Sequence, residues 1–189
     1  AEKQGPVRGE PKMSGDAGPS CRNLFEAFAR IFPRDSIYIT DSGMHQALAR
    51  QYATVFRPRG MLCPADFQSM GLGIPGAIGA KLVSPKSEVI AVVGDGAFLM
   101  TATELLSAVR ERLDLTVLVF NDGALGRIRL QQLEKFGKEC GVTVQNPDFA
   151  LLAEALGATF FQATGDLDRL CHQLLETPGV RILEVPLCD

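Results

Sequence analysis

Two continuous apolar runs, each followed by a cluster of Gly, Asp and Asn, constrain the fold of this chain more than any other feature. Val89 to Val93 and Leu115 to Phe120 are almost wholly apolar instead of alternating with polar residues. Such runs are typical of strands that are covered on both faces, as in a parallel sheet between two layers of helices. Similar runs occur at Ile37 to Thr40, Thr159 to Phe161 and Arg181 to Val185, with a weaker candidate near Met61.

The segments between these runs have the apolar spacing of amphipathic helices. Asp148 and Asp166 precede two of these segments, where a carboxylate can accept hydrogen bonds from the first helical N–H groups. We therefore predict an α/β fold with a doubly wound, mainly parallel six-stranded sheet and helices on both faces. The predicted helices are Leu24 to Ile31, Gly43 to Thr54, Gly73 to Leu82, Thr103 to Arg112, Asp148 to Leu156 and Asp166 to Leu175.

Residues 1–20 differ from the rest because they are rich in Gly, Pro and charge and contain almost nothing that could be buried. We predict a flexible N-terminal tail there and one domain over residues 21–189. The net charge is −3, the basic residues are scattered, and no apolar stretch approaches the roughly 20 residues that span a bilayer. Neither a membrane nor a nucleic acid is therefore expected as a partner.

The five cysteines are far apart and form no Cys-x-x-Cys pair, which argues against a zinc site or a redox couple. A reduced, cytoplasmic environment fits them best. The first residues are polar and lack the basic and then apolar order of a signal peptide. Methionine removal would leave the initial alanine, and a trimmed or cleaved chain would look the same. The cysteines are Cys21, Cys63, Cys140, Cys171 and Cys188.

The segment Gly94-Asp95-Gly96 follows the first apolar run and leads into a helix. Ligands of open α/β sheets bind there, at the carboxyl ends of the strands. The two glycines let the backbone approach a ligand closely, and free N–H groups at the start of the helix can face phosphate oxygens. Asp95 would repel a bare phosphate, so we expect a hard cation between them.

Asn121-Asp122 follows the second apolar run after 24 intervening residues, 97–120. Two adjacent strand ends thus offer oxygen ligands to one site, and magnesium prefers near-octahedral oxygen coordination that includes phosphates and water. Either tripeptide alone is better explained as a tight turn, because Gly, Asn and Asp dominate turns. Together, each behind a buried strand, they favour a metal–diphosphate site.

These residues resemble the cofactor motif of the thiamine-diphosphate enzymes, in which Gly-Asp-Gly is followed some two dozen residues later by Asn-Asn. The resemblance covers about residues 21–189 and lies in the C-terminal diphosphate-binding (PP) domain of the acetolactate synthase, pyruvate oxidase and 2-oxo-acid decarboxylase group. It implies thiamine diphosphate and Mg²⁺ as cofactors. Further matching segments are Thr40-Asp41-Ser42-Gly43-Met44-His45-Gln46, Ser69-Met70-Gly71-Leu72-Gly73-Ile74-Pro75-Gly76-Ala77-Ile78-Gly79-Ala80 and Asn146-Pro147-Asp148-Phe149.

The resemblance implies that Asp95 and Asp122 bind magnesium through their side chains and that Ala124 adds its main-chain carbonyl. Asp122 departs from the family, which usually has Asn at this position, and it places a further negative charge beside the diphosphate. Because its carboxylate still offers oxygen to magnesium, we expect the site to persist. Metal preference and its pH dependence are what this departure puts in question.

The resemblance also assigns cofactor contacts to two walls of a pocket. Gly96 and Ala97 resemble the start of the helix that contacts the diphosphate. Gly43, Met44 and His45 resemble the opposite wall. His45 could equally be a solvent-exposed helix residue; the family-like Gly-x-His-Gln around it favours cofactor contact, and a role in proton transfer stays open.

Met70 matches the position whose bulky apolar side chain presses against the bent cofactor between its two rings, although alone it would be interpreted as core packing. Main-chain groups of Gln68 and Met70 are expected to supply polar contacts. The other residues that we assign to the cofactor site are Ser69, Gly94, Leu125 and Gly126.

Members of this family also need a domain that binds the aminopyrimidine ring and supplies a catalytic glutamate, and nothing in this sequence resembles it. No catalytic residue is therefore assigned to this chain. We predict a separate partner subunit that docks at the carboxyl ends of the strands, in a heterotetramer or another even-numbered heteromer. Without the partner, an apolar rim near Met70, Leu125 and Ile128 would be exposed.

The resemblance implies decarboxylation of a small 2-oxo acid. Three interpretations remain: a split, acetolactate-synthase-like carboligase that joins the resulting acyl carbanion to a second carbonyl, a decarboxylase of the sulfopyruvate or phosphonopyruvate type, and a non-catalytic cofactor-binding remnant. Arg127 or Arg129 could bind a carboxylate, or both could be surface arginines. Gln131 stands where acetohydroxyacid synthases often have tryptophan, which argues against assuming branched-chain amino acid synthesis.

Overall fold

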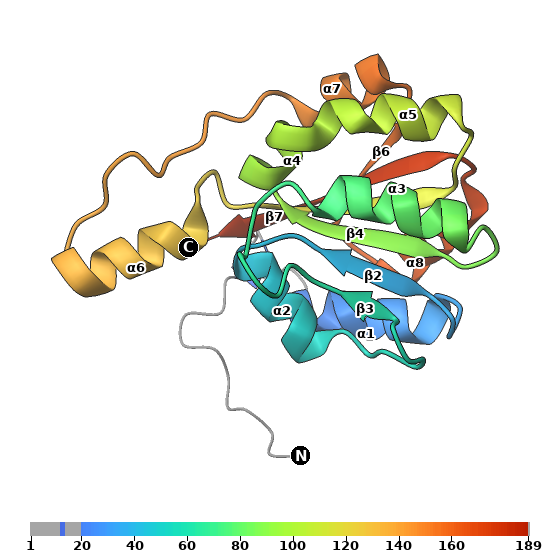
Figure 1. Cartoon of the computed structure of the whole chain (residues 1–189), viewed down its shortest axis with the longest axis horizontal. Helices are drawn as coiled ribbons and strands as arrows, with labels where there is room; N and C mark the ends of the chain where they lie inside the picture. Colours follow the sequence, from blue (N-terminus) through green and yellow to red (C-terminus); the bar gives the residue numbers. More distant parts are fainter. Residues whose placement is uncertain (1–11, 14–19, 189) are drawn as a thin grey trace.

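The computed structural model describes residues 12–13 and 20–188, which form a single sheet with helices on both faces (Figure 1). Six strands are parallel in the order β3-β2-β4-β5-β7, with β6 beside β7, as predicted. A seventh strand, β1, pairs antiparallel with β7 and was not predicted. The strands are β1 (Lys12–Met13), β2 (Ile37–Thr40), β3 (Met61–Leu62), β4 (Val89–Gly94), β5 (Leu115–Asn121), β6 (Thr159–Gln162) and β7 (Val180–Cys188).

The predicted flexible tail over residues 1–20 lies mostly outside the described residues. The part that is described belongs to the fold. Lys12 and Met13 pair with Cys188 and Leu187 in β1. Ser20 caps the first helix, because its hydroxyl accepts a hydrogen bond of 3.2 Å from the backbone N–H of Asn23.

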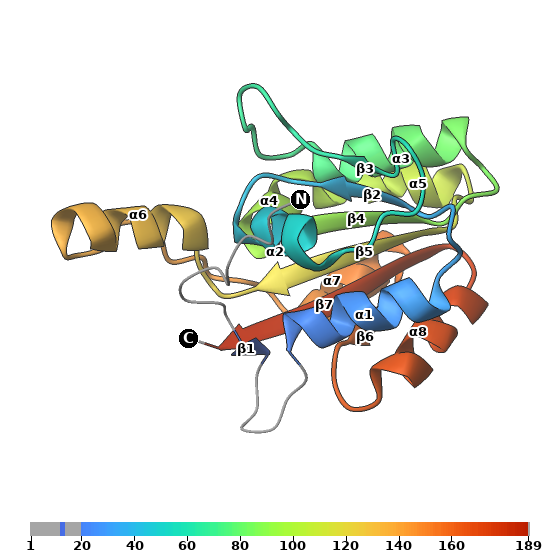
Figure 2. The same cartoon turned by 90° about the horizontal axis from the view of Figure 1, so that it is seen from below.

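The helices divide between the two faces of the sheet, which is the doubly wound arrangement predicted from the continuous apolar strands (Figures 1 and 2). On one face lie α1 (Cys21–Ile31), α2 (Met44–Tyr52) and α8 (Leu167–Glu176). The other face is covered by α3 (Gly73–Val83), α4 (Asp95–Thr101), α5 (Leu105–Arg110) and α7 (Phe149–Leu156). Asp148 and Asp166 cap α7 and α8 as predicted.

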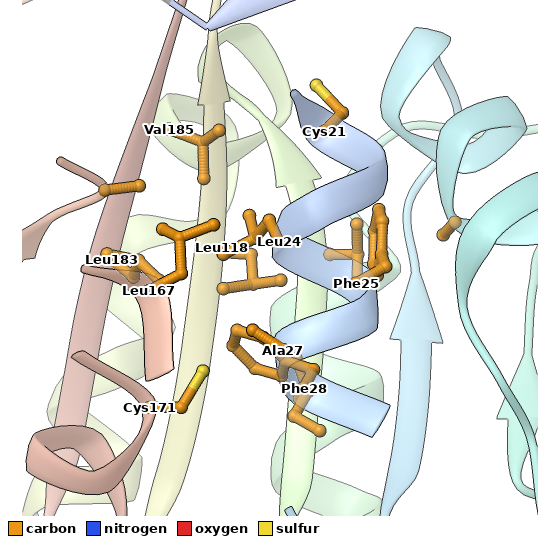
Figure 3. Close-up of a cluster of buried hydrophobic side chains, with 14 of the residues drawn as sticks. Cys21, Leu24, Phe25, Ala27, Phe28, Leu118, Leu167, Cys171, Leu183 and Val185 are labelled. Atoms are coloured by element: carbon orange, nitrogen blue, oxygen red, sulfur yellow. The ribbon is translucent and has the colours of Figure 1, made fainter. Parts of the chain in front are cut away.

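Alternate strand residues point into two separate cores. Figure 3 shows the first core, in which Leu118 and Leu183 of the sheet face Leu24 and Phe28 of α1. The second core contains the intervening residues of the same strands, such as Val117 and Ile182. Removing one such side chain to Ala costs about 2–5 kcal/mol, so the two cores hold the strand ends in a fixed arrangement.

Two helical segments differ from the prediction. The predicted helix over Thr103 to Arg112 is the end of a longer succession in which α4 begins directly at Asp95, a 3-10 turn follows at Ala102–Glu104, and α5 completes it. A further helix, α6 (Gly126–Phe136), projects beyond the carboxyl ends of the strands (Figure 1) and was not predicted as an element. It has no buried residue, so its apolar residues gave no core-facing signal. Within residues 12–13 and 20–188, no helix combines the length and apolar character needed to cross a membrane.

Candidate functional site

The candidate site lies where β4 ends and α4 begins. Asp95 is the first residue of α4 and is 1% exposed, so its carboxylate is fixed by the two cores beneath it. Its Oδ1 accepts a hydrogen bond of 2.8 Å from the N–H of Gly96. Burial raises the pKa of Asp95, while hydrogen bonds from Asn146 and from backbone N–H groups oppose this effect. The carboxylate is therefore held in place without a neutralising charge.

Asn146 joins Asp95 to the neighbouring strand end. Its Nδ2 donates hydrogen bonds of 2.7 Å to Asp95 Oδ2 and 2.8 Å to Asn121 Oδ1. Asn121 Nδ2 in turn donates a hydrogen bond of 2.7 Å to Glu184 Oε1 on β7. The side chain of Asn121 thus connects strand ends, while the adjacent Asp122 is the residue that lines the cavity.

Asp122 supplies the second carboxylate of the site. Its Oδ1 accepts a hydrogen bond of 3.2 Å from the N–H of Ala124, and a Cβ added at Gly126 would clash with its Oδ2. The pKa of Asp122 is raised to about 6, mainly by burial and also by the negative charge of Asp95. The two carboxylates from adjacent strand ends therefore lie in one site, as predicted, and the charge of Asp95 disfavours ionisation of Asp122.

The opposite wall of the site comes from the start of α2. Gly43 has φ 154° and ψ −166°, a backbone region that is essentially restricted to glycine. His45 is 6% exposed and its Nε2 has no hydrogen-bond partner in the described chain. A Cβ added at Gly94 would lie 2.8 Å from His45 Nδ1, so this glycine is needed for the close packing. Burial lowers the pKa of His45 to about 4, which makes the imidazole neutral at pH 7.

A buried carboxylate, Asp41, holds the loop that carries Met70. Asp41 is fully buried, and its Oδ2 accepts hydrogen bonds of 3.0 Å from the N–H of Gly71 and 2.8 Å from that of Gly73. Within this loop Gln68 adopts a positive φ of 51°, which is strained for a residue with a side chain. Strain of this kind persists only where the surroundings enforce it, and Asp41 fixes the chain at Gly71 and Gly73, just after Gln68.

A cavity of about 610 Å³ lies between these walls, within the range of ligand and cofactor sites. It brings together every predicted site residue except Ser69, which is exposed and outside the lining. The predicted residues that line it are Gly43, Met44, His45, Gln68, Met70, Gly94, Asp95, Gly96, Ala97, Asp122, Ala124, Leu125 and Gly126. The structure adds Ser42, Gln46, Ala47, Arg50, Phe120, Arg127, Ile128, Gln131 and Leu187.

The structure distinguishes the two arginines that the sequence left equivalent. Arg129 Nε forms an ion pair of 2.6 Å with Glu139 Oε2 and does not line the cavity. Arg127 lines the cavity, as does Arg50 of α2. Neither Arg50 nor Arg127 forms an ion pair within residues 12–13 and 20–188. The lining of the cavity therefore includes two arginines that form no ion pair with the described part of the chain.

The side chains present fit magnesium and a diphosphate. Asp95, Asp122 and the carbonyl of Ala124 are hard oxygen donors, which magnesium prefers. Neither carboxylate has an ion-pair partner among the described residues, so a bound cation would stabilise both of them. In the same part of the chain, no group of three or more His, Cys, Asp and Glu side chains is placed to hold a metal. The remaining ligands must be main-chain, phosphate or water oxygens.

Sequence reasoning missed the positioning roles of Asp41 and Asn146. Both lie in segments that carried the family resemblance, and that was their only signal. Their partners are distant along the chain: Asp41 is 30 residues from Gly71, and Asn146 is 51 residues from Asp95. Arg50 gave no signal either, because a lone arginine on a helix looks like an ordinary surface residue.

Comparison with known proteins identifies this cavity. The probable 2-ketoarginine decarboxylase AruI of Pseudomonas aeruginosa is 39% identical over 168 residues, which is 86% of this chain and 30% of that protein. Acetolactate synthase of Bacillus subtilis is 33% identical over 156 residues, or 81% of this chain and 27% of its own length. The large subunit of acetolactate synthase isozyme 2 of Escherichia coli is 35% identical over 127 residues, or 66% and 23%.

The chain thus spans less than a third of the length of each of these relatives. Residues 41–185 match the family described as thiamine pyrophosphate enzyme, C-terminal TPP binding domain. The matched region contains both carboxylates and every residue that lines the cavity except Leu187. The predicted resemblance is confirmed, and the chain belongs to the thiamine pyrophosphate (thiamine diphosphate) enzyme family, of which it contains the C-terminal cofactor-binding domain.

Proposed function

We propose that this chain is the magnesium- and diphosphate-binding subunit of a split, acetolactate-synthase-like enzyme that decarboxylates a 2-oxo acid and joins the acyl unit to a second carbonyl. One observation carries the proposal: Asp95 and Asp122 follow adjacent strands and line one cavity, and neither forms an ion pair with a described residue. The positive charge of Arg129 only partly offsets the effects that raise the pKa of Asp122. The acetolactate synthases among the relatives support the carboligase branch.

The residues of this chain would bind and orient the cofactor. Asp95, Asp122 and the carbonyl of Ala124 would hold magnesium, and the magnesium would hold the diphosphate. Met70 and Leu125 flank Gly96: a Cβ added there would lie 3.7 Å from Met70 Cε and 2.9 Å from Leu125 Cδ2. These two side chains would exclude water and support the bent cofactor. When bound, thiamine diphosphate supplies the carbon that adds to the 2-oxo acid and takes up the electrons left by carbon dioxide.

A second unit is needed to complete such a site. We propose a separate pyrimidine-binding subunit that supplies the catalytic glutamate, within a heterotetramer or another even-numbered heteromer. Exposed apolar residues on α6 support this part of the proposal, because Ile128, Leu133 and Phe136 are 46%, 40% and 63% exposed and Ile128 also lines the cavity. A partner that covers α6 would bury them next to the cofactor.

A simple decarboxylase is the second candidate, and the two unpaired arginines favour it. Arg50 and Arg127 would attract a substrate with a distal sulfonate or phosphonate, as in a sulfopyruvate or phosphonopyruvate decarboxylase. They would repel the guanidinium group of a substrate such as 2-ketoarginine. They therefore argue against assigning to this chain the substrate named for the relative with 39% identity. A non-catalytic remnant is less well supported, because Asp95, Asp122 and Met70 are all present in the cavity.

Calorimetric titration tests the proposal. Thiamine diphosphate is titrated with magnesium, and then with EDTA, into the chain alone and into its mixture with a candidate pyrimidine-binding subunit. Binding that depends on magnesium and tightens with the partner supports the proposal and leads to a screen of 2-oxo acids for carbon dioxide release and ligation products. An absence of binding in both samples would leave a family fold without its chemistry.

A further inference from the structure

A row of hydrogen bonds crosses the carboxyl ends of four strands and ends on a proposed metal ligand. Gln162 of β6 donates to Glu184 of β7 at 3.0 Å, and Asn121 of β5 donates to the same carboxylate at 2.7 Å. Asn146 then joins Asn121 to Asp95, with distances of 2.8 Å and 2.7 Å. Asn146 is the one member of this row that lies outside the sheet and outside α4.

The segment that carries Asn146 is fixed on both sides. Before it, the chain returns from α6 and pairs with the loop that follows Asp122. The N–H of Leu125 donates to Val142 O, and the N–H of Val144 donates to Gly123 O, each at 2.8 Å. Two residues after Asn146, α7 begins behind its Asp148 cap. The amide therefore reaches Asp95 from a chain segment that is anchored by main-chain hydrogen bonds on one side and by a helix cap on the other.

An uncharged amide suits this place beside a metal site. One of its N–H groups occupies an acceptor direction on Asp95 Oδ2, and the N–H of Gly96 occupies one on Oδ1. Each oxygen keeps a further lone pair that can face a cation. A lysine or arginine would orient the carboxylate equally well, but its charge would compete with the metal. The Oδ1 of Asn146 is itself buried without a partner in the described chain, so this oxygen is available to a ligand or a water molecule.

We propose that Asn146 is a positioning residue of the magnesium site: it presents the carboxylate of Asp95 to the metal and ties it to Asn121, the neighbour of the second carboxylate. This inference rests on the proposed function, because it assumes that Asp95 binds magnesium. Hydrogen-bonding partners of metal ligands typically contribute 10–100-fold to metal affinity, so loss of the Asn146 amide should weaken magnesium binding by about this factor.

The test measures magnesium binding by calorimetry to the whole chain, alone and mixed with the candidate pyrimidine-binding subunit. Inorganic diphosphate is the co-ligand, with thiamine diphosphate in a parallel series, and binding counts as absent only where both samples lack it. Asn146→Ala removes the amide, and Asn146→Leu removes it while keeping a side chain of similar size. Gln145→Ala is the matched control, because Gln145 is an exposed amide one residue away. Both Asn146 variants should raise the magnesium Kd about 10–100-fold, and excess magnesium should restore diphosphate binding. The control should match the wild type.

Four results decide the positioning role and the proposed function. If the wild type binds magnesium with both co-ligands and either folded Asn146 variant has a magnesium Kd within twofold of it, the positioning role is wrong and the proposed function stands. A loss that excess magnesium does not restore also overturns the role, because it indicates a structural defect. If the wild type binds magnesium with diphosphate but not with thiamine diphosphate, the proposed function fails while the Asn146 variants still decide the positioning role. If the wild type binds magnesium with neither co-ligand, both fail.

Discussion

The two ends of the sheet carry charged clusters that differ in one respect. At the amino ends of the strands, Arg181 is 1% exposed and its Nη2 donates a hydrogen bond of 2.9 Å to Glu88, with further hydrogen bonds to main-chain carbonyls. The buried Lys81 donates a hydrogen bond of 2.8 Å to Ser87 O. At the carboxyl ends, neither Asp95 nor Asp122 forms an ion pair with a described residue.

This difference indicates that the charged groups at the amino ends stabilise the fold and that the carboxylates at the carboxyl ends serve to bind a ligand. A buried ion pair is costly to break because the remaining charge is left in a medium of low dielectric constant. The buried Asp95 and the partly buried Asp122 are already in an unfavourable state, because burial and the charge of Asp95 both raise the pKa of Asp122. Substitutions at the amino ends should therefore reduce stability, and substitutions at the carboxyl ends should reduce cofactor binding.

The largest effect is expected for Glu88→Ala. It leaves the buried guanidinium of Arg181 without its carboxylate and should lower the free energy of unfolding by about 3–5 kcal/mol. Glu88→Gln keeps a hydrogen-bond acceptor for Arg181 Nη2 and should cost clearly less. Urea denaturation at pH 7 measures both. Equal stability of the wild type and Glu88→Ala would show that the amino-end cluster is not structural.

Asp95→Ala is the corresponding change at the carboxyl ends. Removal of a magnesium ligand should weaken magnesium-dependent binding of thiamine diphosphate at least about 100-fold, which corresponds to about 2.7 kcal/mol. The thermal midpoint of the metal-free chain should be unchanged or higher, because burial already disfavours the ionised carboxylate. Calorimetric titration and thermal unfolding give the two values. A large loss of stability with intact cofactor affinity would reverse the comparison between the two ends.

The carboxyl-end site was largely predictable because its main residues follow a local rule. Asp95 and Asp122 each come directly after a continuous apolar run, and parallel strands bring their carboxyl ends to one edge. The same argument predicted the parallel sheet and both helix layers. The sequence pattern was sufficient because strand burial on two faces leaves a signal in every residue of the strand.

The other features of the site and fold could not be predicted, because they depend on contacts between residues distant in the sequence or on a helix without buried residues. Asp41 and Asn146 act through hydrogen bonds to Gly71 and Asp95 that no local pattern specifies. The helix α6 has no buried residue, so its apolar spacing did not indicate a face. Arg127 and Arg129 are equivalent in sequence, and only the ion pair with Glu139 separates them.

A third, smaller effect concerns pH at the second wall of the site. The pKa of His45 is lowered to about 4 in the folded chain from an ordinary 6.5, so folding favours the neutral imidazole. The stability that depends on His45 is present above pH 6.5 and is lost as the pH falls toward 4. Between pH 7 and pH 5, His45 should reduce the free energy of unfolding by about 2 kcal/mol.

Asp122 acts in the opposite direction over the same pH range, because its raised pKa makes the folded chain take up a proton more readily. The effect of His45 is therefore measured as a difference. Denaturation of the wild type and His45→Gln at pH 7 and pH 5 should show that the variant loses less stability on acidification. If the free energy of unfolding changed equally in the two proteins, His45 would be accessible to water and its pKa would not be lowered by burial.

The smallest effect is expected for Asp122→Asn, which restores the residue that is usual in the family. The amide oxygen remains a magnesium ligand, so the affinity for thiamine diphosphate with magnesium should stay within about tenfold of the wild type. The metal-free chain should gain about 1 kcal/mol at pH 7, after allowance for solvent screening, because the substitution removes a carboxylate whose ionised form is disfavoured by burial and by the charge of Asp95. Asp66→Asn removes an exposed carboxylate outside the cavity and should change neither value. Since stability and affinity are measured on the same two proteins, a loss of stability in Asp122→Asn would show that the carboxyl-end carboxylates support the fold, as those at the amino ends do.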